Sequence, residues 1–188
     1  MTTTDTTMLL AALSLADRGF SVFPTCWPVF PDGPDGEALC ACGAGHRGRD
    51  IGKAPVGRLA PHGFKAATTD KAIIAGWWTA CPQANVAVAT GAVSGLVVLD
   101  IDPAHGGMDS LMAWIDRYGP LRETLSVATG GGGWHLYFEH PGPGVVIPST
   151  AGRLGPGLDV RADGGYVVAP PSLHKSGRIY EWGALRWE

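Results

Sequence analysis

Apolar residues recur at the i, i+3, i+4 spacing of an amphipathic helix in three stretches of the chain. The first stretch runs from about Thr7 to Arg18 and is followed by a glycine, a common helix stop. The second lies between Thr69, whose hydroxyl can cap the free amides of a first turn, and Pro82. The third begins near Met108 and is stopped by a Gly-Pro pair. The pattern therefore predicts three helices.

Eight short segments are rich in strand-forming residues and are mostly bounded by glycine, proline or other turn residues. They cover 21–24, 85–89, 96–102, 125–129, 134–139, 158–161, 166–170 and 178–182. Most of them fall in the second half of the chain, which is therefore expected to be rich in sheet. We expect 85–89 and 96–102 to share a central sheet. The simplest packing is an α+β sandwich with the helices on one sheet face.

The segment 26–61 interrupts this pattern. It is rich in glycine, proline and cysteine and shows no sustained periodicity, which is unusual for a connection of this length inside a compact domain. With 188 residues and no internal repeat or low-complexity linker, the chain fits one domain over 1–188. We therefore expect 26–61 to be an insertion that something other than a hydrophobic core keeps in order.

Charge is distributed unevenly along the chain. The formal net charge of −3 argues against a protein that coats nucleic acid through charge alone. Between His46 and Lys65, however, five cations accompany the single acid Asp50, whereas acids predominate over 100–139. One region can hold phosphates and the other cations, although two ordinary solvated faces would give the same counts.

The N-terminus has no basic stretch before an apolar run, and no apolar run approaches the roughly 18–20 residues that span a bilayer. These features predict a cytoplasmic protein without a membrane partner. In that compartment the four cysteines are expected to be reduced thiols or metal ligands rather than disulfides.

An apolar strand over 96–102 ends in two carboxylates, Asp100 and Asp102. Side chains alternate along a strand that rises about 3.3 Å per residue, so the two project from the same face with their Cα atoms about 7 Å apart. Two like charges this close are costly unless a cation or a base neutralises them, which favours a Mg²⁺ or Mn²⁺ site. The alternative is that Asp102 only begins a turn at Pro103.

A second candidate is the glycine run that precedes the strand 134–139. Gly132 and Gly133 can bring backbone amides close to an anion, and the neighbouring imidazole of His135 can donate to a triphosphate oxygen. In the strand, Trp134, Leu136 and Phe138 are expected on one face and His135 with Tyr137 on the other. A flexible hairpin with a hydrogen-bonded histidine is the alternative.

A third carboxylate follows in the strand 158–161, where the period of two places Asp159 and Arg161 on one face. Three carboxylates, waters and substrate phosphates can hold two hard cations, the arrangement that in-line nucleotidyl or phosphoryl transfer uses.

Taken in order, these motifs resemble the bifunctional DNA primase/polymerase family of the archaeo-eukaryotic primase superfamily. The resemblance rests on Asp100-Ile-Asp102, Gly132-Gly-Trp-His-Leu-Tyr-Phe138, Leu158-Asp-Val-Arg161 and Gly164-Gly-Tyr-Val-Val-Ala-Pro-Pro-Ser172. It includes Gly52-Lys-Ala-Pro55, His62-Gly-Phe-Lys-Ala-Ala-Thr68, Trp77-Trp78 and Asn85-Val-Ala-Val-Ala-Thr-Gly91. It thus covers nearly the whole chain.

The resemblance implies an RRM-like mixed or antiparallel sheet core with flanking helices. It implies an enzyme that makes or extends primers with NTPs or dNTPs on single-stranded DNA, in the replication of plasmids, phages or mobile elements. Asp100, Asp102 and Asp159 match the carboxylates that bind two Mg²⁺ or Mn²⁺ ions, and His135 matches the histidine that contacts the nucleotide. A helicase region of the same full-length protein is a further expected partner.

One position departs from the family pattern. Family members often carry a serine two residues before the histidine, where this chain has Gly133. Main-chain amides of the glycine run are our hypothesis for a substitute. Further residues expected to contact nucleotide or template are Lys53, Lys65, Arg161, Ser172 and His174.

The cysteine-rich insertion offers four soft or borderline ligands for a tetrahedral Zn²⁺ ion: Cys26, Cys40, Cys42 and His46. A metal would explain how a segment rich in glycine and proline becomes ordered, and family members have similar zinc-binding insertions. His62 can replace one ligand. The alternative is a mobile loop with free thiols.

The sequence thus predicts a two-metal nucleotidyltransferase. The rival interpretations are a non-catalytic module that binds single-stranded nucleic acid and a metal-dependent phosphohydrolase that uses the same carboxylates.

Overall fold

A computed structural model describes residues 4–183 of the chain. Its α-helices are α1 (Thr4–Asp17), α2 (Lys71–Ala80) and α3 (Gly107–Tyr118), which confirms the three helices predicted from periodicity. The predicted cap of α2 is wrong. The N-cap is Asp70, whose carboxylate accepts hydrogen bonds from the amides of Ala72 at 2.8 Å and Ile73 at 3.2 Å. A carboxylate at this position also interacts favourably with the positive end of the helix dipole.

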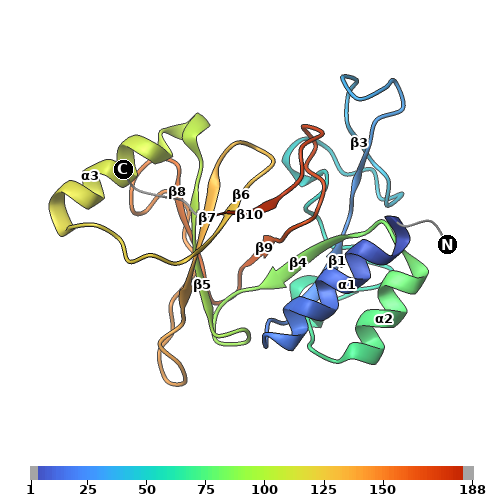
Figure 1. Cartoon of the computed structure of the whole chain (residues 1–188), viewed down its shortest axis with the longest axis horizontal. Helices are drawn as coiled ribbons and strands as arrows, with labels where there is room; N and C mark the ends of the chain where they lie inside the picture. The colour runs from blue at the N-terminus through green and yellow to red at the C-terminus, as the bar shows by residue number, and fades with distance from the viewer. Residues whose placement is uncertain (1–3, 184–188) are drawn as a thin grey trace.

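Two antiparallel sheets form the centre of the fold (Figure 1). The three-stranded sheet has the order β1-β4-β9, with bounds Val22–Thr25, Asn85–Ala89 and Tyr166–Val168. The five-stranded sheet has the order β10-β6-β7-β5-β8, with bounds Glu181–Gly183, Leu125–Ala128, Trp134–Glu139, Leu96–Ile101 and Leu158–Arg161. The protein is therefore a mixed α+β fold, as expected.

Two packing expectations are wrong. β4 and β5, predicted to share one sheet, belong to different sheets, because the turn at 91–95 leads the chain from one sheet into the other. The helices do not share one face either. α1 and α2 pack on the three-stranded sheet, whereas α3 packs on the five-stranded sheet at the other end of the molecule (Figure 1). Each sheet has an apolar face that needs its own cover.

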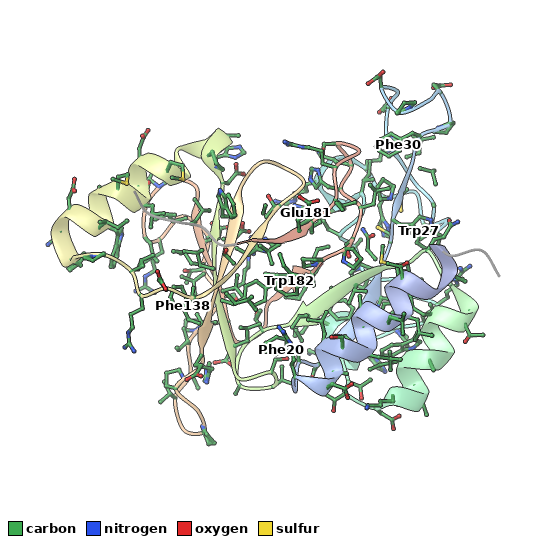
Figure 2. The ribbon with its side chains drawn as sticks, in the orientation of Figure 1. Phe20, Trp27, Phe30, Phe138, Glu181 and Trp182 are labelled. Atoms are coloured by element: carbon green, nitrogen blue, oxygen red, sulfur yellow. The ribbon has the colours of Figure 1, made fainter. Side chains whose placement is uncertain are left out.

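Two hydrophobic clusters follow from this layering. The larger runs from α1 and α2 through the three-stranded sheet to one face of the five-stranded sheet, where Val98, Val127 and Tyr137 contribute. The smaller lies between the opposite face of the five-stranded sheet and α3, with Leu136 and Leu158 at its centre. Figure 2 shows Phe138 on the five-stranded sheet, where it packs against this smaller cluster. The predicted alternation along β7 is thereby confirmed.

The insertion 26–61 has little regular structure. It contains the two-residue strands β2 (Pro28–Val29) and β3 (Leu39–Cys40), which form a hairpin, and the 3₁₀ helix η1 (Gly48–Asp50). Figure 2 shows Phe30 on the projecting part of this hairpin. Two further 3₁₀ helices, η2 (Gly63–Ala66) and η3 (Pro103–His105), precede α2 and α3. Over residues 4–183, none of the helices has the length and apolar character that crossing a bilayer requires.

Candidate functional site

Three of the predicted site residues lie side by side across the five-stranded sheet. Asp100 on β5 is in register with His135 on β7 and with Asp159 on β8. Residues in register on antiparallel strands project from the same face, with Cβ atoms about 4.5–5.5 Å apart. The face is the one turned away from α3, because Ile101 and Leu136, the next residues along β5 and β7, are buried in the cluster beneath that helix. We call Asp100, His135 and Asp159 the polar row.

The two carboxylates of the polar row share one guanidinium. Arg161 donates from Nη2 to Asp159 Oδ2 at 2.7 Å, and its Nε lies 3.8 Å from Asp100 Oδ2. Asp159 Oδ1 also accepts from the Gly152 amide at 2.8 Å. The positive charge offsets the repulsion between the acids. Asp100 is held less closely than Asp159. Its two contacts, with Arg161 Nε at 3.8 Å and with His135 Nε2 at 3.7 Å, are both longer than hydrogen bonds.

His135 is the buried member of the polar row. Burial lowers its pKa below the usual value, Lys53 and Arg161 lower it further, and the nearby Asp100 opposes the shift. The imidazole therefore stays neutral near pH 7. Its Nδ1 is buried and has no hydrogen-bond partner among the described residues. A neutral ring has one N–H donor and one acceptor nitrogen, so His135 can donate one hydrogen bond to an anion.

Asp102 lies just beyond the end of β5 and is engaged locally. Its carboxylate caps η3 by accepting from the Ala104 amide at 3.0 Å, and it pairs with His105 Nδ1 at 2.7 Å. The side chain is 50% exposed. Each carboxylate oxygen has two lone pairs, so these contacts leave capacity for a cation. The turn at Pro103, weighed as the alternative to a metal site, is thus present.

Two members of the polar row, Asp100 and His135, line a cavity of about 420 Å³, which we call the main pocket, while Asp159 lies beside it in the sheet. Its lining includes Asp100, His135 and Arg161 on the five-stranded sheet, and Gly164, Gly165 and Tyr166–Val168 at β9. The insertion contributes Arg49, Asp50 and Lys53, and Phe64, Ser149 and Tyr180 complete the wall. Three cations against two acids can bind a ligand that carries several negative charges.

Sequence reasoning missed several of these residues. Phe64 lies inside a motif that the family resemblance includes, and Arg49 inside the basic segment, so both carried a usable signal. Tyr166 also lies in a motif of the resemblance, whereas Tyr180 was predicted only as a strand residue. Burial raises the pKa of both phenols, and the carboxylate of Asp100 contributes at Tyr180. Both therefore stay protonated at neutral pH.

The predicted glycine contacts lie elsewhere. Gly132 and Gly133 line a second hollow of about 480 Å³ together with Arg178, a cation that sequence reasoning also missed. The Gly132 amide donates to Thr129 O and the Gly133 amide to Thr129 Oγ1, both at 2.9 Å. A Cβ on Gly133 would lie 2.2 Å from the carbonyl oxygen of Ile101. The close approach of β5 to the start of β7 therefore requires a glycine at this position. A serine here would fit only if the backbone shifted.

The remaining predicted contacts are spread over the molecule. Lys53 lines the main pocket, whereas the exposed Lys65 lines a smaller hollow beside it. Ser172 is fully buried, where its Oγ accepts from the Val86 amide and donates to the Val86 carbonyl. His174 is also buried, and burial together with nearby cations lowers its pKa to about 4.

The four predicted zinc ligands come together. The ligand atoms of Cys26, Cys40, Cys42 and His46 all lie within 4.8 Å of one another, and we call them the Cys/His cluster. The Cys40 and Cys42 sulfurs are 3.1 Å apart and lie 3.4 and 3.3 Å from His46 Nδ1. Zn–S bonds of about 2.3 Å and Zn–N bonds of about 2.0 Å in a tetrahedron separate the ligand atoms by roughly 3.5–3.8 Å. The cluster therefore fits a zinc ion with small adjustments.

The thiols of this cluster differ in acidity. Burial raises the pKa of Cys26 to about 12 and also raises that of Cys42, with Cys40 adding to both shifts. Burial acts in the same direction at Cys40, but hydrogen bonds from Cys42 and His46 outweigh it and lower its pKa. Cys40 is thus the readiest thiolate. His62, the alternative ligand, is exposed beside η2 and outside this group.

Comparison with known proteins agrees with these motifs. A search of curated proteins finds no match to the chain. The sequence profile described as bifunctional DNA primase/polymerase, N-terminal, matches residues 12–186, which include the polar row, the main pocket and the Cys/His cluster. The chain therefore belongs to the family of bifunctional DNA primase/polymerase N-terminal domains.

Proposed function

We propose that the protein catalyses template-directed nucleotidyl transfer on single-stranded DNA, with the main pocket as its nucleotide site. The observation that carries the proposal is the register of β5 with β7 and β8. That register sets Asp100 between His135 and Asp159 at the wall of a cation-rich cavity. The RRM-like character of the sheet core is part of the proposal, supported by the antiparallel five-stranded sheet with α3 on one face.

Asp100, Asp102 and Asp159 would hold two Mg²⁺ or Mn²⁺ ions. Carboxylate oxygens are the ligands these cations prefer, and the contacts of Asp100 at 3.7 and 3.8 Å are long enough to leave its oxygens available. Bound divalent cations would lower the pKa of the attacking 3′-hydroxyl and neutralise charge on the phosphates. The reaction forms a bond from the 3′-oxygen to the α-phosphorus and releases pyrophosphate.

The protein's own groups bind and orient the nucleotide. Arg161 pairs with the carboxylates of the polar row, and Lys53 and Arg49 also line the main pocket, so the three provide positive charge for a triphosphate. His135 would donate a hydrogen bond to a phosphate oxygen from its neutral ring, whose position is fixed by burial. Preorganised donors of this kind lower a barrier without having to reorient during the reaction. The nucleotide would be an NTP or a dNTP.

The Cys/His cluster is proposed to hold a structural zinc ion, supported by the ligand separations given above. The partners of the domain would be a single-stranded DNA template, a primer and a helicase region of the same full-length protein. Plasmid, phage or mobile-element replication is the proposed setting.

The test is primer synthesis and primer extension on single-stranded DNA with Mg²⁺ or Mn²⁺, supplying NTPs and dNTPs separately. Wild type is compared with Asp100→Asn and Asp159→Asn. Asp116→Asn, an exposed acid on α3, is the matched control. We expect strand products from wild type and Asp116→Asn, and loss of products from the other two variants while the fold is retained.

Three other outcomes would count against the proposal. Tight binding of single-stranded DNA without nucleotide incorporation would identify a non-catalytic binding module. Release of phosphate from nucleotides without any lengthened strand would identify a phosphohydrolase. Full activity of Asp100→Asn would remove the metal role assigned to the polar row.

A further inference from the structure

Three aromatic rings form a continuous series from the core to the main pocket. Phe23 on β1 is fully buried and meets the ring of Tyr166 edge-on, with centroids 5.2 Å apart. Tyr166 is then nearly parallel to Phe64, at 23° and 6.3 Å between centroids. Tyr166 also donates from its hydroxyl to the Lys53 carbonyl at 3.3 Å. Phe64 is therefore the outermost ring, supported from behind by a fixed tyrosine.

Phe64 stands between two hollows. It lines the main pocket, and it also lines a neighbouring cavity of about 310 Å³ together with Lys65, Val93 and Gly164. The side chain is only half-buried, although phenylalanine gains most when it is removed from water. An apolar ring held open to a cavity with charged walls is suited to a flat, polarisable ligand group.

The turn that carries Phe64 is short and anchored. η2 spans Gly63–Ala66 and packs against β1 and β4, and the Ala67 amide bonds to the Phe64 carbonyl at 3.1 Å. Thr68 exchanges two backbone hydrogen bonds with Val22 on β1, both at 3.0 Å. The backbone that carries the ring is therefore anchored to the sheet, and the ring itself is held on one side by Tyr166.

The main pocket has aromatic side chains on one side and charged side chains on others, including Arg49, Asp50 and Lys53 of the insertion. Phe64 and Tyr166 lie on the side of η2 and the three-stranded sheet, whereas Arg161 and the polar row lie on the five-stranded sheet. A cavity of about 420 Å³ lies within the range of roughly 300–1,000 Å³ typical of sites for small molecules. A nucleotide has the same two-part chemistry, with a flat base at one end and a phosphate chain at the other.

We infer that Phe64 is the stacking platform for the nucleobase of the nucleotide bound in the main pocket, an inference that rests on the proposed function. The base lies on the exposed face of the Phe64 ring while the triphosphate reaches the cations near Asp100. Every base has a π-face, so stacking gives affinity without choosing a base. That property suits an enzyme in which the template strand selects each nucleotide.

The test compares two ligands that differ only in the base. Equilibrium binding of ATP and of ribose 5′-triphosphate is measured by calorimetry with Mg²⁺ and without a template, for wild type and Phe64→Leu. Loss of a base–aromatic stack costs about 5- to 150-fold in affinity. We expect wild type to bind ATP more tightly by a factor in that range, and Phe64→Leu to bind both ligands with nearly equal affinity.

Two further variants control the comparison. Tyr118→Leu makes a similar change at an aromatic residue that is 61% exposed at the end of α3, and it should retain the preference for ATP. Phe64→Trp keeps an aromatic platform and should retain or increase it. Unchanged binding of ribose 5′-triphosphate by Phe64→Leu shows that the phosphate end of the pocket is still folded.

The outcomes separate the two claims. If wild type prefers ATP and Phe64→Leu retains that preference, the platform is overturned while the nucleotide site stands. The same holds if wild type binds both ligands equally. If wild type binds neither ligand, the proposed nucleotide site fails and the platform fails with it.

Discussion

The Cys/His cluster and the carboxylates differ in how far the fold assembles them. In the cluster, the ligand atoms of Cys40, Cys42 and His46 and that of the more remote Cys26 all lie within 4.8 Å of one another. It is the only group of three or more potential metal-ligating side chains that meets this spacing within 4–183. At the carboxylates, Arg161 holds Asp159 and approaches Asp100, while Asp102 caps η3. The Cys/His cluster thus has the spacing of a metal site, whereas the carboxylates are engaged by protein groups.

This difference agrees with the two proposed roles. A structural zinc site stabilises the fold only if its ligands are already collected in the native state. A site for hard cations that act together with substrate phosphates need not be complete before the nucleotide arrives, since the phosphates supply part of the coordination. The contrast predicts that changes at the carboxylates affect activity and that changes at the cluster affect stability.

The largest effect is expected on the carboxylate side. Asp100→Asn should lower primer extension by at least about 10³-fold, because it removes a charge from the proposed metal site. Its melting temperature should stay close to that of wild type, since Asp100 makes only long contacts in the native protein. Single-turnover extension and calorimetry measure the two quantities. A variant that retained activity but unfolded easily would reverse the contrast.

The matching change in the cluster is Cys40→Ser. It should abolish stoichiometric zinc in the purified protein and lower the free energy of unfolding by roughly 2–4 kcal/mol, or about 5–15 °C in melting temperature. Zinc analysis and calorimetry test this. Cys81→Ser, at a buried cysteine outside the cluster, is the control and should keep its zinc. A Cys40→Ser protein with wild-type zinc content would exclude the cluster as the site.

The position of the carboxylates at the end of β5 should also depend on close packing between β5 and β7. Gly133→Ala places a Cβ where Ile101 O is 2.2 Å away, so the ends of β5 and β7 must separate. We expect a loss of about 1–3 kcal/mol in stability, together with reduced extension because Ile101 lies between Asp100 and Asp102. Gly131→Ala, whose Cβ would meet nothing closer than 3.7 Å, is the control. Equal stability of both variants would contradict the packing argument.

The smallest predicted effect concerns the attachment of the insertion. His174 lines a hollow with Ala38 and Ile51 of the insertion, and its folded pKa of about 4 lies below the ordinary value of about 6.5. The unfolded chain therefore binds the proton more readily. The stability that neutral His174 provides is complete above pH 6.5 and is lost as the pH falls towards 4.

His174→Gln should remove that dependence. Between pH 7 and pH 5, wild type should lose about 1 kcal/mol more than the variant, after allowance for solvent screening. Urea unfolding at a series of pH values measures the difference. Parallel pH profiles for the two proteins would show that His174 does not titrate as the structure indicates.

Features that depend on local sequence patterns, such as helices and the faces of strands, could be predicted. Strand alternation placed His135 and Leu136 on opposite faces of β7, and the chemistry of thiols and imidazole identified a ligand set that the fold brings together. Helical periodicity found all three helices. Their ends differ from the prediction: α1 begins at Thr4 rather than near Thr7, and the cap of α2 is Asp70, which is adjacent to the predicted Thr69.

Local patterns could not predict non-local geometry, and only the family resemblance implied that the three carboxylates meet. The pairing of Asp100 with Asp159 depends on a register between strands almost 60 residues apart, and the separation of β4 from β5 depends on how each sheet is covered. The glycine run that contains Gly133 has the composition of an anion-binding loop. In the structure, however, Gly133 is needed for close packing against Ile101. Phe64 lies in a turn without periodicity, so its motif could mark the segment as important while the fold shows that its ring faces a pocket.

Asp100, Asp102 and Asp159 are proposed to bind common divalent cations together with a nucleotide. The most direct measurement is anomalous diffraction from crystals grown with Mn²⁺ and a non-hydrolysable nucleotide. We predict manganese peaks in contact with these three carboxylates and with the phosphates, next to His135. Manganese bound elsewhere, or a nucleotide in the main pocket with Asp159 still paired to Arg161 and no ion beside it, would contradict the account.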